Sequence, residues 1–225
     1  MNSFWAIYNS EESFLPFFLP LTIWVSTLVY TLLPSKDPRP KWGDWTFIHQ
    51  LHNLIIIIGW ISLYFQDDSI FHERIGILWS LSYFLVDFIY CAFILREDQK
   101  AFVLHAALCL ALGLANYNTP ILRVLRMNSR AAQCELSTPF LFLSRKTRKP
   151  LHFILFAIVF TLCRIVHIPY YLILPARHQG QLQWNHWIML ALIMFYALNC
   201  FWYMKILKIL LSGGKTEKKS NIKKD

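Results

Sequence analysis

Four ionisable side chains that lie within apolar segments carry the chemistry this sequence could perform. Asp87, His105, Glu135 and His52 each belong to a different apolar run. An ionisable group costs about 2.5–3.5 kcal/mol at the centre of a membrane helix, so such groups face a protein interior or a water-filled cavity. At a rise of 1.5 Å per residue, all four are expected about 6–12 Å from the same membrane face. The candidate catalytic residues among them are His105, Asp87 and Glu135, and Asp87 could orient or charge-balance His105.

Asp87, His105, Glu135 and His52 could instead serve only to hold the helices together. Polar groups in membrane helices tie neighbouring helices together through hydrogen bonds that average about 0.6 kcal/mol. Tyr83 and Asp87 are four residues apart and share one helix face. The short turn at 96–100 makes the helix of Asp87 a neighbour of the helix of His105. Several costly groups at one depth favour a shared site over independent packing.

A second polar group is expected deeper in the membrane. Arg164 and His167 lie three residues apart before Pro169, and Arg126 and Arg130 lie at similar depth on the preceding span. Together these side chains could hold an anionic group such as a phospholipid phosphate through charge-assisted hydrogen bonds. The alternative is that they pair with Glu135 and with backbone carbonyls. The sequence leaves both readings open.

Long apolar runs must position these groups. Of the 225 residues, 56% are hydrophobic and 16% aromatic, which exceeds the roughly 45–50% apolar content of soluble domains. A membrane span needs about 20 such residues. The expected spans are 14–33, 46–64, 74–95, 101–117, 120–143, 151–175 and 187–211. We therefore predict an all-α polytopic membrane bundle of seven spans, or six.

The distribution of charge predicts the orientation of the bundle. With seven spans and a cytosolic C-terminus, most Lys and Arg residues fall on the cytosolic side, and Arg74 and Arg177 fall on the other. The N-terminus is then lumenal or outside. This bias explains the net charge of +9 without a nucleic-acid partner. The five cysteines lie in apolar runs without metal-ligand spacing, so no metal site and no cofactor are expected.

These residues form a recognisable pattern. The chain resembles the TLC-domain family, and most of all its small TLC domain-containing members, from about Trp45 to Leu210. The most specific piece is the stretch from Glu135 to Phe140, which reads Glu-Leu-Ser-Thr-Pro-Phe. The other matching pieces are His52, Tyr83 to Asp87, the region of His105, Arg164-Ile165 and Asn199 to Lys205.

The resemblance implies a bundle of six or seven spans around a lipid-sized cavity, in an endomembrane or the plasma membrane. Ceramide synthases of this family are acyl-CoA-dependent N-acyltransferases with two adjacent histidines in the fourth span. This sequence has Leu104-His105 at that place, and it lacks the aspartate-rich pattern of those enzymes. Both departures count against ceramide synthesis. They leave open whether the protein is an enzyme.

We expect three parts: an N-terminal transmembrane helix with a basic cytosolic loop at 1–40, a TLC domain at 41–211 and a Lys-rich cytosolic tail at 212–225. The expected function is lipid binding in an intramembrane cavity, with an influence on lipid composition or homeostasis. The expected partners are membrane lipids (a fatty acyl chain, a phospholipid or a sphingoid base), and a homodimer is left open. The expected lipid-binding residues are His52, Tyr83, Arg126, Arg130, Arg164, His167 and Asn199.

Two alternatives remain beside lipid binding. The first is an acyl-CoA-dependent acyltransferase that uses His105, with acyl-CoA as substrate rather than cofactor. The second, more remote, is a seven-span receptor, because the predicted topology is the same. The terminal Lys223-Lys224-Asp225 lies one position out of register with a dilysine signal, and with the resemblance it favours the endoplasmic reticulum.

Overall fold

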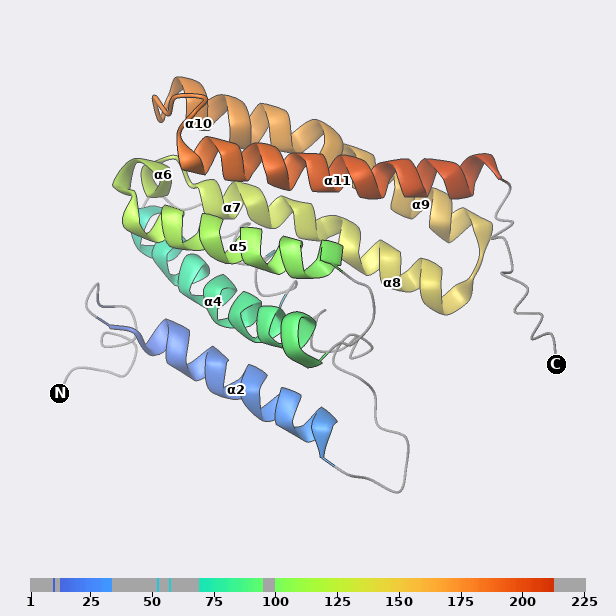
Figure 1. The fold of residues 1–225 in the computed structure, drawn as a ribbon, viewed down its shortest axis with the longest axis horizontal. Coiled ribbons are helices and arrows are strands. Elements are labelled where there is room, and N and C mark those ends of the chain that lie inside the picture. The colour runs from blue at the N-terminus through green and yellow to red at the C-terminus, as the bar shows by residue number, and fades with distance from the viewer. Residues whose placement is uncertain are drawn as a thin grey trace.

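The computed structural model describes residues 10, 13–33, 52, 57, 69–94 and 100–212, and for 69–72 the backbone alone. The described residues form helices and no strands (Figure 1). The longer helices are α2 (Leu15–Leu32), α4 (Ser69–Ile89), α5 (Lys100–Asn118), α8 (Ser137–Thr147), α9 (Pro150–Phe160) and α11 (Trp187–Leu211). The shorter helices are η2 (Tyr90–Ile94), α6 (Pro120–Val124), α7 (Met127–Ala132), η3 (Gln133–Leu136), η4 (Thr161–Val166), η5 (Pro169–Ile173) and α10 (Leu174–His178).

Five helical stretches of the described chain are long and apolar enough to cross a membrane. They are Leu15–Leu32, Glu73–Ile94, Lys100–Asn118, Pro150–His178 and Trp187–Leu211. Five of the seven expected spans are therefore found, close to their expected bounds. The expected span at 46–64 lies outside the described residues, apart from His52 and Ile57.

The expected span at 120–143 is not one continuous helix. It is divided into α6, α7, η3 and α8, which together run along the bundle from one end to the other (Figure 1). The first break falls at Arg126, whose φ of 54° is left-handed and interrupts the helix. The span at 120–143 therefore stays a prediction, and hydrophobicity did not indicate this break because it reports the length of a segment and not the backbone conformation of one residue.

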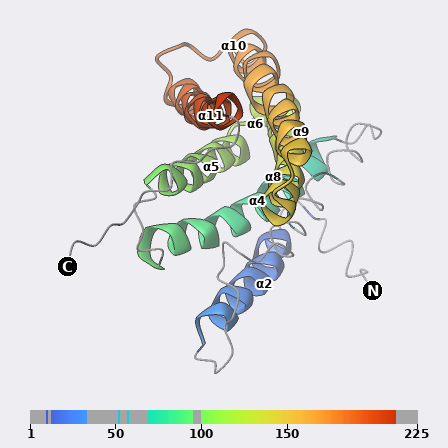
Figure 2. The same cartoon turned by 90° about the vertical axis from the view of Figure 1, so that its right-hand side faces the viewer.

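Helix α2 packs against α4 through one narrow stripe. Pro16, Pro20, Trp24 and Leu28 are buried and follow each other at intervals of four residues, so they share one helix face. Trp24 Nε1 donates a hydrogen bond to Ser82 Oγ on α4 at 3.2 Å. The two views agree in placing α2 at the edge of the bundle, beside α4 and far from α10 and α11 (Figure 2). Its other faces carry large exposed apolar side chains, as expected of a helix that faces lipid.

Helices α4 and α5 approach each other closely at Gly113. A Cβ atom at this position would lie 2.8 Å from Leu81 Cδ2 on α4. Small residues let membrane helices come together in this way, because packing rather than the hydrophobic effect holds helices together in lipid. On its other side α5 packs with α11 in the main core, where Leu108, Leu192 and Phe195 are buried. Helix α5 is therefore the centre of the bundle.

The stretch Pro150–His178 consists of α9, η4, η5 and α10, and it contains π-helical turns around Pro169. Proline has no N–H group and cannot donate to the carbonyl of Ile165, four residues earlier. Tyr196 on α11 donates its hydroxyl to that carbonyl at 3.3 Å. A neighbouring helix thus satisfies the backbone group, as buried groups in lipid require.

Basic side chains gather at one end of the bundle. Helix α5 begins at this end, and α8 and α11 end there (Figure 1). Lys100 opens α5, Arg145 and Lys146 lie in the last turn of α8, and Lys208 lies in the last turn of α11. We call this the basic end of the bundle; the opposite end, where α6 and α10 lie, carries Arg123 and Arg177.

Candidate functional site

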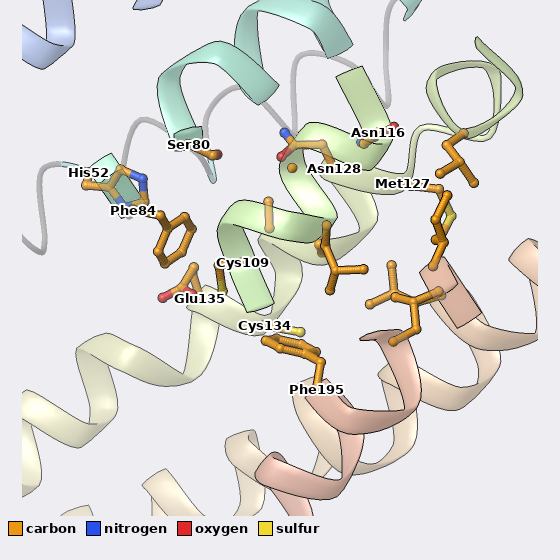
Figure 3. A pocket seen from close by; sticks show the side chains of 18 residues that line it. His52, Ser80, Phe84, Cys109, Asn116, Met127, Asn128, Cys134, Glu135 and Phe195 are labelled. Atoms are coloured by element: carbon orange, nitrogen blue, oxygen red, sulfur yellow. The ribbon is translucent and has the colours of Figure 1, made fainter. Parts of the chain in front are cut away.

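A cavity lies inside the bundle, between α4, α5, α6, α7, η3, η5 and α11. Eighteen residues line the cavity, and its volume is about 100 Å³ (Figure 3). Leu112, Leu122, Met127, Leu192 and Phe195 are among the apolar lining residues. The lining residues with a polar side chain or a thiol are His52, Ser80, Cys109, Asn116, Asn128, Cys134 and Glu135. Mostly apolar walls with a few polar groups are typical of small-molecule sites.

Glu135 lies at one edge of the cavity, next to Phe84 and Cys109 (Figure 3). It belongs to the 3₁₀-helix η3, and its Oε1 lies 3.7 Å from Arg164 Nη2 on the π-helix η4. Its Oε2 accepts a hydrogen bond from Thr138 Oγ1 at 2.9 Å. Irregular helical turns of these two kinds occur frequently at functional sites.

Arg164 joins three elements of the bundle. Its Nε donates to the carbonyl of Cys134 at 3.1 Å and to Ser137 Oγ at 3.0 Å, and its Nη1 donates to Asn199 Oδ1 at 3.1 Å. The guanidinium also lies over the ring of Phe160. Arg164 is 7% exposed and Asn199 is fully buried. This network fixes η3 and α8 against η4 and α11, and so holds one wall of the cavity.

His52 and Tyr83, both expected lipid-binding residues, lie together. Their rings are stacked with centroids 3.8 Å apart and an angle of 17°. His52 is 2% exposed and lies edge-on to Trp24 and Phe84. Tyr83 does not line the cavity, so it supports His52 from behind, and His52 forms part of the cavity wall.

His105 lies directly behind the cavity wall. Its ring stacks on Phe195 with centroids 5.6 Å apart and lies edge-on to Phe84 and Trp202. Cys109 Sγ lies 3.7 Å from His105 Nε2 and 4.0 Å from Nδ1, so the sulfur contacts the ring rather than one nitrogen. Asp87 is half-buried on α4, one helical turn after Tyr83. Its pairing with His105 stays a prediction.

The expected anion site is divided in two. His167 Nε2 lies 2.9 Å from the carbonyl of Arg130, and Arg130 Nη1 donates to the carbonyl of Tyr171 at 3.3 Å. Arg126 forms the left-handed turn before α7. Arg164 instead contacts Glu135 and a backbone carbonyl. These contacts correspond to the alternative reading, in which the cations pair with Glu135 and with carbonyls.

Sequence reasoning missed Glu73, which it placed in a connection between spans. This residue is fully buried on α4. Its carboxylate accepts hydrogen bonds from the N–H of Asn128 at 2.5 Å, from the N–H and hydroxyl of Ser129 and from Asn116 Nδ2 at 3.3 Å. The signal in the sequence was indirect: Asn116 and the Asn-Ser pair at 128–129 are polar groups in apolar surroundings, which need partners.

Long apolar helices that face outward with large apolar side chains, and that bury polar networks between them, define an integral membrane protein with an internal cavity. The sequence model of the TLC domain matches residues 21–208. The chain therefore belongs to the TLC-domain family. No curated protein and no solved structure matches it significantly.

Proposed function

We propose that this TLC-domain protein binds a lipid in the cavity between α4, α5, α7 and α11 and thereby influences the lipid composition of its membrane. The cavity carries the proposal. Helical proteins close-pack their interiors, so open space of about 100 Å³ beside polar side chains is a feature that packing alone does not produce. Because the surrounding solvent is lipid, an acyl chain is the abundant molecule that matches the apolar walls.

The proposed orientation puts the basic end of the bundle in the cytosol. Lys100, Arg145 and Lys146 lie at that end, and cytosolic connections are the ones enriched in Lys and Arg. The cavity edge formed by Glu135 would then face the cytosolic half of the membrane. We propose the endoplasmic reticulum as its compartment, on the strength of the family.

Filling the cavity tests the proposal. Ala131 lines the cavity, whereas Ala197 on α11 is exposed toward lipid. Native mass spectrometry of the purified protein should show co-isolated lipid for the wild type and for Ala197→Phe. The Ala131→Phe variant should lose that lipid while remaining monodisperse. Equal lipid retention by both variants would show that the bound lipid is outside the cavity, and would overturn the proposal.

A second candidate function is acyl transfer at His105. The observation that favours it is that His105 contacts Phe84, Cys109 and Phe195, all three of which line the cavity. As a base, the imidazole would take the proton from an acceptor hydroxyl or amine while this attacks the thioester carbonyl of acyl-CoA, and CoA would leave as the thiol. As a nucleophile, it would carry the acyl group transiently.

The His105→Ala variant decides this second candidate. If the imidazole reacts, cells that express the variant should lose the lipid product that the wild type makes, while the purified variant still retains lipid in the cavity. The wild-type protein incubated with acyl-CoA should in addition show an acyl adduct by intact mass measurement. Identical lipid profiles for wild type and variant would leave lipid binding as the function.

A further inference from the structure

We propose that the cavity selects a lipid whose head group donates hydrogen bonds and carries no negative charge, such as a glycerol hydroxyl without phosphate. This inference deepens the proposed function and rests on it, because it assumes that a lipid occupies the cavity. The charges that line the cavity carry the inference. Among the described residues, no Lys or Arg side chain lines it, whereas the carboxyl group of Glu135 does.

The Glu135 carboxylate has an unused acceptor. Oε2 accepts the hydroxyl of Thr138, but Oε1 is 3.7 Å from Arg164 Nη2, beyond hydrogen-bond distance. Within the described part of the chain, no other group donates to Oε1. The Glu135 side chain is 18% exposed, and it lies at the cavity edge (Figure 3). A hydroxyl or amine of a bound lipid would supply the missing donor.

Arg164 does not turn this edge into a phosphate site. Its side chain is 8% exposed and is not among those that line the cavity. Its Nε and Nη1 already donate to the carbonyl of Cys134, to Ser137 and to Asn199. An anion that enters the cavity would meet the carboxylate before the guanidinium. Like charges brought together without water between them repel strongly, so phosphate is disfavoured.

The other end of the cavity offers no cation either. Its polar lining residues are the neutral amides Asn116 and Asn128. The Asn116 amide donates to Glu73, which fixes its orientation, and its buried Oδ1 has no donor among the described residues. Glu135 Oε1 and Asn116 Oδ1 are therefore two acceptors, at opposite ends of the cavity, that lack a donor among the described residues. A head group with hydroxyl or amine donors can satisfy them, whereas a phosphate without protons cannot.

Two lipids that differ only in phosphate test the inference. In the test, 1-oleoylglycerol and 1-oleoylglycerol 3-phosphate compete for the purified protein, and native mass spectrometry measures the ratio of the two bound lipids. The wild type should prefer the phosphate-free lipid by about tenfold or more, because the phosphate meets a carboxylate. The Ala131→Phe variant should bind neither, which assigns the signal to the cavity.

Changing the charge of one residue sharpens the test. Glu135→Gln keeps the shape and an amide oxygen but removes the negative charge and leaves Arg164 without its counter-ion. The preference should fall to about threefold or less, or reverse in favour of the phosphate-bearing lipid. Thr138→Val is the matched control, because it removes a hydrogen bond to Glu135 but leaves both charges in place. Its preference should equal that of the wild type.

The outcomes separate the two proposals. Equal binding of both lipids, or a preference for the phosphate-bearing lipid by the wild type, would overturn the ligand class and leave lipid binding in the cavity intact. If the wild type binds neither lipid and its co-isolated lipid is unaffected by Ala131→Phe, the proposed function fails as well. The wild-type ratio decides the ligand class even where Glu135→Gln does not fold.

Discussion

Glu73 on α4 caps the first turn of α7 by accepting the backbone N–H of Ser129, at 3.2 Å from Oε2. The first N–H groups of a helix have no partner within the helix and need an acceptor. Here the acceptor comes from a different helix, because α7 begins inside the bundle beside the fully buried Glu73. The same carboxylate holds Asn116 of α5. Glu73 therefore determines the position of three cavity walls.

Replacing Glu73 by Ala should destabilise the protein by about 3 kcal/mol, because it leaves two buried backbone donors and the Asn116 amide without an acceptor. Glu73→Gln retains an acceptor oxygen and should cost less. Ser129→Ala, which removes one hydroxyl donor, should cost about 1 kcal/mol. Unfolding of the purified protein by titration with SDS measures all three. Equal SDS midpoints of unfolding for Glu73→Ala and Ser129→Ala would contradict the role of Glu73 as the cap of α7.

Replacing Arg164 by Gln should destabilise the protein by about 3–5 kcal/mol, because Glu135 keeps its charge without a cation in a largely buried site. The double variant Arg164→Gln/Glu135→Gln removes both charges. Its cost should be smaller than the sum of the two single costs, with a coupling of about 1–3 kcal/mol. The same SDS titration measures the free energy of unfolding of the wild type, the two single variants and the double variant, which together form a double-mutant cycle. Additive costs would mean that the 3.7 Å contact contributes nothing.

Introducing a methyl group at Gly113 should push α4 and α5 apart, since the new Cβ lies 2.8 Å from Leu81 Cδ2. Overpacking of this kind costs about 1–3 kcal/mol. In a protein that already carries Leu81→Ala, the obstructing atoms are absent and Gly113→Ala should be close to neutral. Thermal unfolding in detergent, compared in the two backgrounds, measures the difference. A similar cost in both would assign the effect to the cavity lining instead of the helix contact.

The sequence predicted the parts of the fold that depend on hydrophobicity alone. Five expected spans agree with the long apolar helices of the described chain, because an apolar run of about 20 residues has few alternatives to a membrane helix. The break at Arg126 could not be predicted in this way. A positive φ is uncommon for a residue other than glycine, and here it directly precedes α7, whose first turn Glu73 caps.

The site was predictable as a set of residue types but not as a set of pairs. His52, Tyr83, Arg164 and Asn199 were all expected lipid-binding residues, and the structure pairs His52 with Tyr83 and Arg164 with Asn199. Which cation pairs with Glu135 depends on the rotation of each helix about its axis. The π-helical turns at η4 and η5 shift that rotation, and no periodicity in the sequence reports them.

The division of residues 120–147 into short helices has a mechanical consequence. A continuous helix such as α11 resists bending through its ladder of hydrogen bonds, and moving one turn disturbs the turns on either side. At Arg126 that ladder is already interrupted, so displacement of α6 relative to α7 leaves the ladders of both pieces unbroken. Displacing α6 relative to α7 at this point therefore breaks fewer backbone hydrogen bonds than bending a continuous helix such as α11.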